Sequence, residues 1–154
     1  MVRGVFDLRT LLESAVAAYR DGFPAVRIVL DAPPDACWLQ GNAELIVQLL
    51  DKLIENAVDF CPPSGSITVR VRSTGDAHEL SVANDGPPIP PDVLGRLFES
   101  LFEHRPGHGD TPHFGLGLYI VKLIAEFHGG RAGAANLAGD GGAEFTVILP
   151  VAAT

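Results

Sequence analysis

The chain has 154 residues, 47% of them hydrophobic, and a formal net charge of -8 at pH 7, which fits one folded domain with a substantial core and excludes a disordered chain. The acidic balance and the lack of a basic cluster argue against a nucleic-acid partner, since binding to nucleic acid requires local positive charge. With two cysteines and no apolar run of about 20 residues, we expect a reduced, soluble domain without a disulfide framework, a signal peptide or a membrane span.

The first third of the sequence predicts one helix and two short strands. Apolar residues recur at helical spacing over residues 8–19, and Asp7 precedes them as a candidate N-cap. Residues 26–30 and 37–39 are short β-prone runs. The segment between these runs is rich in proline and aspartate, which is typical of a turn.

A second, longer helix is predicted to begin after Asn42 and to end near Phe60, where a Pro-Pro-Ser-Gly segment follows. Residues 66–72 alternate apolar and polar side chains. Residues 79–83 continue after a Ser-Thr-Gly-Asp turn. Both segments are expected to be half-buried antiparallel strands.

The last part of the chain predicts a short helix over residues 91–101, followed by a mobile loop over residues 102–113. Residues 115–128 predict a helix that ends at a Gly-Gly pair, and residues 144–149 a final strand. This irregular alternation predicts one α+β domain over residues 1–154, without internal repeats. Its expected architecture is a two-layer sandwich, with a mixed, mostly antiparallel sheet and helices on one face.

Three polar residues lie along one edge of the apolar face of the helix predicted after Asn42. Lys52 and Asp59 fall beside Asn56 at i-4 and i+3, so the three side chains form one stripe. The oxygen of the Asn56 amide is a suitable hard ligand for a Mg²⁺ ion that also binds nucleotide phosphates. The same stripe is equally typical of a solvated helix edge.

A polar turn follows the strand predicted at residues 79–83. Asn84 could accept a hydrogen bond from an adenine amino group, and Gly86 would let a flat base lie against the backbone. Alternatively, the Asn-Asp-Gly-Pro segment is only a turn. Leu97 and Phe98, further along, form an apolar pair of the kind that anchors a short helix to a core.

Gly115 and Gly117 open the last predicted helix. Without side chains at these positions, backbone N–H groups can approach an anion at the positive end of the helix dipole. The pair therefore predicts a nucleotide phosphate site. The same pattern also serves to pack a loop tightly against a sheet.

These signals, in this order, resemble the ATP-binding catalytic domain of two-component sensor histidine kinases, within the superfamily shared with type II topoisomerases. Residues 55–57 are similar to the N-box, residues 84–89 to the first glycine box, residues 97–99 to the F-box and residues 115–118 to the second glycine box. The resemblance implies a Bergerat-type fold that binds ATP and Mg²⁺, with a lid at about 87–114. The nucleotide-binding residues that it implies are Asn56, Phe60, Asn84, Gly86, Ile89, Gly115, Leu116, Gly117 and Leu118, with Asn56 also as the metal ligand.

Several positions depart from the pattern of that family. Lys52 stands where an asparagine is usual, and Asn84 where an adenine-reading aspartate is usual. Pro88 and His113 each replace a glycine, and Asp59 replaces a basic residue. These differences bear on nucleotide affinity and metal dependence, although Asn84 can still accept the adenine hydrogen bond and Lys52 can neutralise phosphate charge.

The resemblance also implies the kind of reaction. Hydrolytic relatives carry a glutamate general base at position 52, whereas an ammonium group with an ordinary pKa of about 10.4 is a poor base. Phosphoryl transfer to a histidine is therefore expected, with Lys52, Asn56 and Arg105 as catalytic residues. Arg105 could offset phosphate charge or be a solvated loop residue.

No phosphoacceptor helical hairpin is expected in the chain, and His78 is interpreted as an ordinary strand residue. The implied partners are a phosphoacceptor histidine domain of the same parent protein and a response regulator. The implied location is the cytoplasm, as a domain of a longer parent protein that is anchored in the inner membrane.

Two other functions stay open at this point. His104, His108 and His113, with Asp110, crowd one predicted loop and carry suitable donor atoms for a metal ion. Alternatively, the domain is an interaction module with a degenerate nucleotide site.

Overall fold

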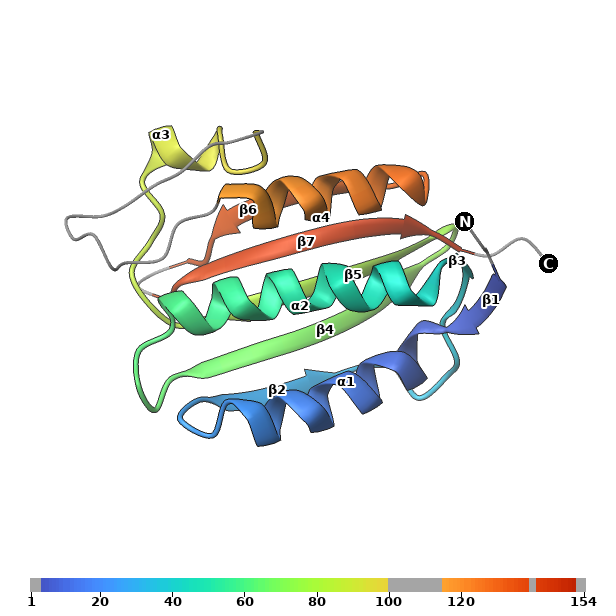
Figure 1. Cartoon of the computed structure of the whole chain (residues 1–154), viewed down its shortest axis with the longest axis horizontal. Coiled ribbons are helices and arrows are strands. Elements are labelled where there is room, and N and C mark those ends of the chain that lie inside the picture. The colour runs from blue at the N-terminus through green and yellow to red at the C-terminus, as the bar shows by residue number, and fades with distance from the viewer. Residues whose placement is uncertain (1–3, 100–114, 139–140, 152–154) are drawn as a thin grey trace.

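The computed structural model describes residues 4–99, 115–138 and 141–151, which form a two-layer α/β arrangement (Figure 1). The elements in chain order are β1 (Gly4–Asp7), α1 (Leu8–Gly22), β2 (Arg27–Asp31), β3 (Trp38–Gly41), α2 (Ala43–Phe60), β4 (Ser66–Thr74), β5 (Ala77–Asn84), α3 (Pro91–Leu94), α4 (Gly115–Phe127), β6 (Arg131–Asn136) and β7 (Ala143–Pro150). The α+β sandwich expected from the sequence is confirmed.

The main sheet has five strands in the order β2-β4-β5-β7-β6. Only the β2–β4 pair is parallel, so the sheet is mixed and mostly antiparallel. Helices α1, α2 and α4 lie on one face of it (Figure 1). Strands β1 and β3 form a separate two-stranded antiparallel sheet.

The hydrophobic core lies between the helices and the sheet. Six apolar side chains of α2 are fully buried there: Ile46, Leu49, Leu50, Leu53, Ile54 and Ala57. From the sheet, β4 contributes alternate residues, as its sequence pattern predicts. Burying these apolar surfaces is what holds the two layers together.

Strand β5 is more buried than the expected half-buried strand. Leu80 and Val82 face the core, and Ser81 on the opposite face is only 7% exposed. In the sheet register Ser81 lies between Arg70 of β4 and Thr146 of β7. Ser81 therefore lies in a central strand with a neighbour on each side, a position that the sequence of β5 alone does not reveal.

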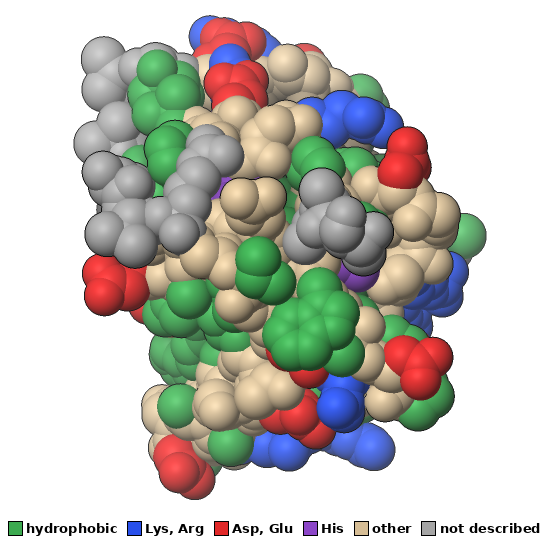
Figure 2. All heavy atoms as spheres, turned by 90° about the vertical axis from the view of Figure 1, so that its right-hand side faces the viewer, with side chains coloured by type: hydrophobic (Ala, Val, Ile, Leu, Met, Phe, Trp, Pro, Cys, Tyr) green, Lys and Arg blue, Asp and Glu red, His purple; other side chains and the backbone are tan. Residues whose placement is uncertain are grey.

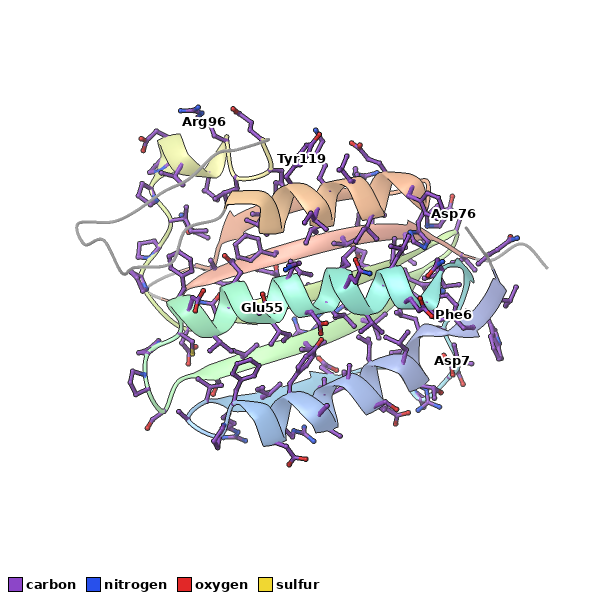
Figure 3. All side chains as sticks on the ribbon, in the orientation of Figure 1. Phe6, Asp7, Glu55, Asp76, Arg96 and Tyr119 are labelled. Atoms are coloured by element: carbon purple, nitrogen blue, oxygen red, sulfur yellow. The ribbon has the colours of Figure 1, made fainter. Side chains whose placement is uncertain are left out.

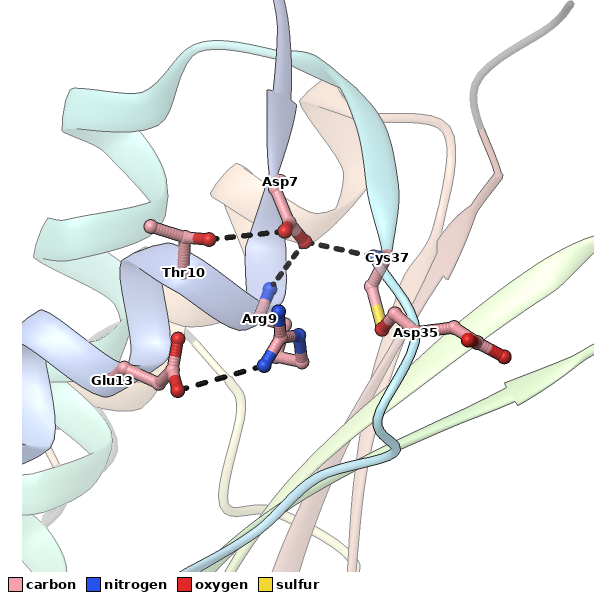
Figure 4. Close-up of polar contacts among 6 residues, drawn as sticks. All are labelled: Asp7, Arg9, Thr10, Glu13, Asp35 and Cys37. Atoms are coloured by element: carbon pink, nitrogen blue, oxygen red, sulfur yellow. Dashed lines mark hydrogen bonds and ion pairs between the residues drawn. The ribbon is translucent and has the colours of Figure 1, made fainter.

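Both predicted N-caps are confirmed. Asp7 caps α1 by accepting a hydrogen bond from the backbone N–H of Arg9 at 3.0 Å. It also accepts from the Cys37 N–H at 2.8 Å and the Thr10 hydroxyl at 3.0 Å (Figure 4). Burial opposes ionisation, but these hydrogen bonds outweigh it and lower the pKa of Asp7. Asn42 caps α2 through the Leu45 N–H at 3.0 Å.

His128 links the C-terminal end of α4 to the N-terminal end of α2. Its Nδ1 donates to the carbonyl of Ile124 over 2.8 Å, and its Nε2 accepts from the N–H of Asn42 at 3.0 Å. Because a backbone N–H can only donate, the ring is neutral with its proton on Nδ1. A Cβ at Gly41 would collide with this ring, so that position requires glycine.

Four sequence predictions needed correction. The helix expected at 91–101 ends at Leu94, where Gly95 follows, and residues 100 and 101 lie outside the described residues. Strands β1 and β6 were not predicted, because β1 is only four residues long and β6, with the sequence RAGAAN, has little β propensity. The observed bounds of β2, β3, β4, β5 and β7 also differ from the predicted ones by one or more residues.

Exposed apolar residues occur on the β1–β3 ribbon, at the end of the molecule that faces the viewer in Figure 2. Val5 is 60% exposed and Trp38 is 52% exposed. Within the described part of the chain, no helix has the length and apolar character needed to cross a bilayer.

Candidate functional site

The C-terminal half of α2 carries Asn56, which is only 8% exposed. Its Nδ2 atom is buried and has no hydrogen-bond partner. For Asn56, the solvated-edge interpretation is therefore wrong. A buried amide without a partner costs free energy, so this nitrogen is a candidate ligand-binding group.

Lys52 lies one turn before Asn56 on the same helix. Its side chain is 38% exposed, and its Nζ lies 3.8 Å from the carboxylate of Glu55. A Cβ placed on Gly117 would lie 3.9 Å from the Lys52 Cδ. The structure thus brings the lysine of α2 against the glycine at the start of α4, as a phosphate site at that point requires. Asp59, the third residue of the predicted stripe, is exposed.

Asn84 ends β5 on the face of the sheet that the helices cover. Its side chain is 2% exposed, and Nδ2 donates to the backbone carbonyl of Asp85 at 2.9 Å. The Oδ1 atom is buried without a partner. Since a carbonyl can only accept, this hydrogen bond fixes the amide with Oδ1 as the free acceptor.

Gly86 follows β5 and lies close to the last residue of α2. Its φ of +141° is a conformation that favours glycine. A Cβ at this position would lie 2.6 Å from the carbonyl oxygen of Phe60 and 3.6 Å from Nδ2 of Asn84. Phe60 and Asn84, which are 24 positions apart (84 - 60) in the sequence, therefore meet at this glycine.

The start of α4 supplies the remaining predicted nucleotide contacts. Gly115 and Leu116 are its first two residues. The side chain of Leu118 is 1% exposed and belongs to the core, so only its backbone is available to a ligand. Tyr119, labelled in Figure 3, follows on the same helix.

The segment after Gly86 is tied to the sheet through Ile89. The Ile89 N–H donates to Oδ1 of Asn136 at 2.7 Å, and Nδ2 of Asn136 donates to the Ile89 carbonyl at 2.8 Å. The Ile89 side chain is 5% exposed. Leu97 is fully buried and Phe98 packs against the core, so the predicted anchoring role of this pair is confirmed.

Among described residues, three buried side-chain nitrogen or oxygen atoms have no hydrogen-bond partner. Two of them are Asn56 Nδ2 and Asn84 Oδ1, and the third is Nε of Arg9 on α1. The site thus presents one free donor on α2 and one free acceptor on β5. A ligand that spans the two must carry complementary polar groups at both ends.

Cys61 follows α2 and is buried. Burial raises the pKa of its thiol, and the nearby carboxylate of Asp85 raises it further. A protonated thiol is a weak nucleophile. Asp85 itself accepts a hydrogen bond from the Ser66 N–H at 2.8 Å, which places this carboxylate in a structural role.

Some predicted residues cannot be placed. Arg105, His104, His108 and His113 lie outside the described residues, as does most of the predicted lid at about 87–114. In the described ranges, no group of three His, Cys, Asp or Glu side chains could hold a metal ion. His78 lies buried in β5, where its Nδ1 bonds the Ser73 hydroxyl at 2.8 Å, consistent with an ordinary strand residue.

Asn136 is the one residue of this region that the sequence interpretation missed. It lies in a Gly/Ala-rich segment without a recognised motif. Its only sequence signal is that a polar amide ends a run of small apolar residues, which does not identify its partner.

Comparison with known proteins gives consistent matches. The model of the family described as histidine kinase-, DNA gyrase B- and HSP90-like ATPase matches residues 41–153. The sensor histidine kinase TrcS of Mycobacterium tuberculosis is 31% identical over 150 residues, which is 94% of this chain and 29% of TrcS. The chain therefore spans less than a third of that relative.

Solved structures agree in fold. The catalytic domain of the histidine kinase ThkA, in a nucleotide-free form, superimposes with a TM-score of 0.85 at 23% identity, covering 98% of this chain and 99% of that domain. Full-length ShkA in complex with AMPPNP gives a TM-score of 0.82 at 25% identity, covering all of this chain and 32% of ShkA.

Fold and site together define an ATP-binding domain of the Bergerat type. The chain belongs to the histidine kinase-, DNA gyrase B- and HSP90-like ATPase family. The relatives that it matches in sequence are sensor histidine kinases.

Proposed function

We propose that this domain binds ATP with Mg²⁺ and donates the γ-phosphoryl group to a histidine on another domain of its parent protein. The observation that carries the proposal is the pair of buried, unpartnered amide atoms, Nδ2 of Asn56 and Oδ1 of Asn84. A degenerate nucleotide site would have no ligand to compensate these two polar atoms. Their retention therefore favours a working site.

Asn84 is placed to recognise the base. Its Oδ1 is held as an acceptor by the bond from Nδ2 to Asp85, and the exocyclic amino group of adenine is a donor. Phe60 and Gly86 adjoin Asn84 and would contact the ring, and Ile89 follows three residues after Gly86. This arrangement selects a purine with a donor at that position.

The phosphates would lie between α2 and the start of α4. Gly115, Leu116 and Gly117 would offer backbone N–H groups at the positive end of α4, and the aliphatic part of the Lys52 side chain lies beside Gly117. The Asn56 amide combines a donor for a phosphate oxygen with an acceptor oxygen for Mg²⁺. When bound, Mg²⁺ supplies neutralisation of phosphate charge.

The chemistry that these residues support is transfer rather than hydrolysis. The imidazole nitrogen of the acceptor attacks the γ-phosphorus, a P–N bond forms, the bond to the β-phosphate oxygen breaks, and ADP leaves. Lys52 stands where a general base would be needed to activate water, and an ammonium group cannot accept a proton. Its positive charge instead stabilises the leaving phosphate, and Arg105 would assist from the loop.

Names of similar proteins support the proposed partners. ThkA has been solved in complex with the response regulator TrrA, and ShkA with AMPPNP. We infer that this domain likewise works with a response regulator and with the phosphoacceptor domain of its own parent. The parent would be anchored in the inner membrane with this domain on the cytoplasmic side, as the sensor proteins among its relatives suggest.

Calorimetric titration with AMPPNP, with and without Mg²⁺, tests the proposal. Metal-dependent binding is expected, and no binding at millimolar nucleotide would overturn it in favour of an interaction module. Mixing the domain with ATP and a separately produced phosphoacceptor domain of its parent should then give an acid-labile, base-stable phosphoprotein. The Lys52→Ala variant should transfer more slowly.

A further inference from the structure

Asn136 and Ile89 form a two-point connection between strand β6 and the segment that follows the first glycine box. One carboxamide satisfies both backbone polar groups of Ile89, with N···O distances of 2.7 and 2.8 Å. The two residues are 47 positions apart in the sequence. A side chain that pairs both groups of one residue imitates a step of β-sheet pairing.

Asn136 also shares a cross-strand row with Asn84. In the sheet register Asn84 of β5 is opposite Ala143 of β7, and Ala143 is opposite Asn136 of β6. Neighbouring strands lie about 4.8 Å apart, so the two asparagines lie roughly 10 Å apart on the same face. The small, buried side chain of Ala143 separates them.

The amides of Asn84 and Asn136, at the two ends of this row, differ in their hydrogen bonds. Asn84 leaves one acceptor free, whereas both polar ends of the Asn136 amide are engaged by Ile89. Both polar atoms of the Asn136 amide are bonded to the Ile89 backbone, and the two bonds fix the orientation of the amide. Its effect on the site is exerted through the position of Ile89.

We propose that Asn136 is a positioning residue for nucleotide binding, which fixes the Ile89 backbone as a preformed wall of the base pocket. This inference rests on the proposed function, because Ile89 is assigned to the nucleotide there. A preformed wall spares the nucleotide the entropic cost of ordering this segment. Freeing Ile89 should weaken binding through the base and leave the phosphate contacts unchanged.

The decisive variant is Asn136→Leu, which keeps the size of the side chain and removes both hydrogen bonds. We expect affinity for AMPPNP to fall about tenfold. Because the loss concerns the base, it should be equal in Mg²⁺ and in EDTA. Asn136→Asp keeps the acceptor for the Ile89 N–H but loses the donor to the Ile89 carbonyl. Its affinity for AMPPNP should lie between that of the unsubstituted domain and that of Asn136→Leu.

A second measurement does not depend on nucleotide. In the ligand-free state, hydrogen exchange of the Ile89 amide should be slow in the unsubstituted domain and fast in Asn136→Leu. The amide of Val82 in the central strand should stay protected in both proteins. Ser73→Ala serves as the matched control, because it removes two side-chain hydrogen bonds, to His78 and to Cys37, on β4 beside the opposite end of β5. It should change neither the affinity nor the exchange of Ile89.

The outcomes separate this inference from the proposed function. If the unsubstituted domain binds no nucleotide, the proposed function fails. Hydrogen exchange of the Ile89 amide still tests the connection between Asn136 and Ile89 in that case. Unchanged affinity in Asn136→Leu and in Asn136→Asp would overturn the positioning role, as would an Ile89 amide that stays protected in Asn136→Leu. A loss of affinity that appears only in Mg²⁺ would place the effect at the phosphates and also overturn it.

Discussion

The side-chain nitrogen of Asn84 donates to the backbone carbonyl of the next residue, Asp85, over 2.9 Å. This bond fixes which end of the amide faces the site, so that a neutral asparagine presents only an acceptor. The family usually reads adenine with an aspartate at this position. Here the acceptor carries no charge, and the amide does not titrate in the physiological range.

Replacing Asn84 with leucine should lower ATP affinity at least tenfold and reduce selectivity for ATP over GTP, because guanine carries a carbonyl where adenine carries its amino group. Competitive titration with both nucleotides measures this. Equal loss for ATP and GTP would show that Asn84 does not read the base.

Asn56→Ala should weaken Mg²⁺-dependent nucleotide binding about tenfold or more. The domain should stay folded, because the Nδ2 atom of Asn56 has no hydrogen-bond partner within the protein to lose. Calorimetry in Mg²⁺ and in EDTA, with circular dichroism to check folding, gives the answer. An affinity in Mg²⁺ equal to that of the parent would remove Asn56 from the metal role.

Gly117→Val should abolish ATP binding by filling the space that phosphates approach. Among the residues that the structure describes, a Cβ at Gly117 would contact only the Lys52 Cδ, at 3.9 Å, so the fold should tolerate the change. Leu123→Val is the matched control, since it places the same β-branched residue at a 44% exposed position of the same helix. If Gly117→Val binds ATP normally, the phosphate site has been wrongly placed.

Asp7→Ala should destabilise the domain by about 1 kcal/mol near neutral pH, through loss of the α1 cap. The folded-state pKa of Asp7 is lowered, so its contribution is fully present above the unfolded value of about 4 and is lost as pH falls through the folded pKa. Urea unfolding of both proteins across this range should show the difference shrinking in acid. A constant difference would contradict the role of the ionised carboxylate.

Local sequence signals predicted the parts of the fold that depend on neighbours in the chain. Helix α2 could be placed because its apolar spacing, its Asn42 cap and the prolines after Phe60 agree. Strand β6 could not, since its alanines and glycine gain their extended conformation from pairing with β7. Helix α3 is shorter than expected because Gly95 follows its first turn.

The candidate site shows the same division. Asn56 and Asn84 stand in recognisable motifs, and the structure adds the burial and the unpartnered atoms that distinguish a ligand site from a solvated edge or a simple turn. The link between Asn136 and Ile89 depends on a contact across 47 positions, which no local pattern encodes. The orientation of the Asn84 amide likewise required the position of the Asp85 carbonyl.

The hydrogen bond between His128 and Asn42 also joins the two helices of the candidate site. It fastens the last turn of α4 to the first turn of α2, at the end remote from Gly117. The Lys52 side chain packs beside Gly117 at the other end, so the two helices contact each other at both ends. Their spacing is therefore set by side-chain packing at the proposed phosphate site and by a hydrogen bond to a buried imidazole at the remote end.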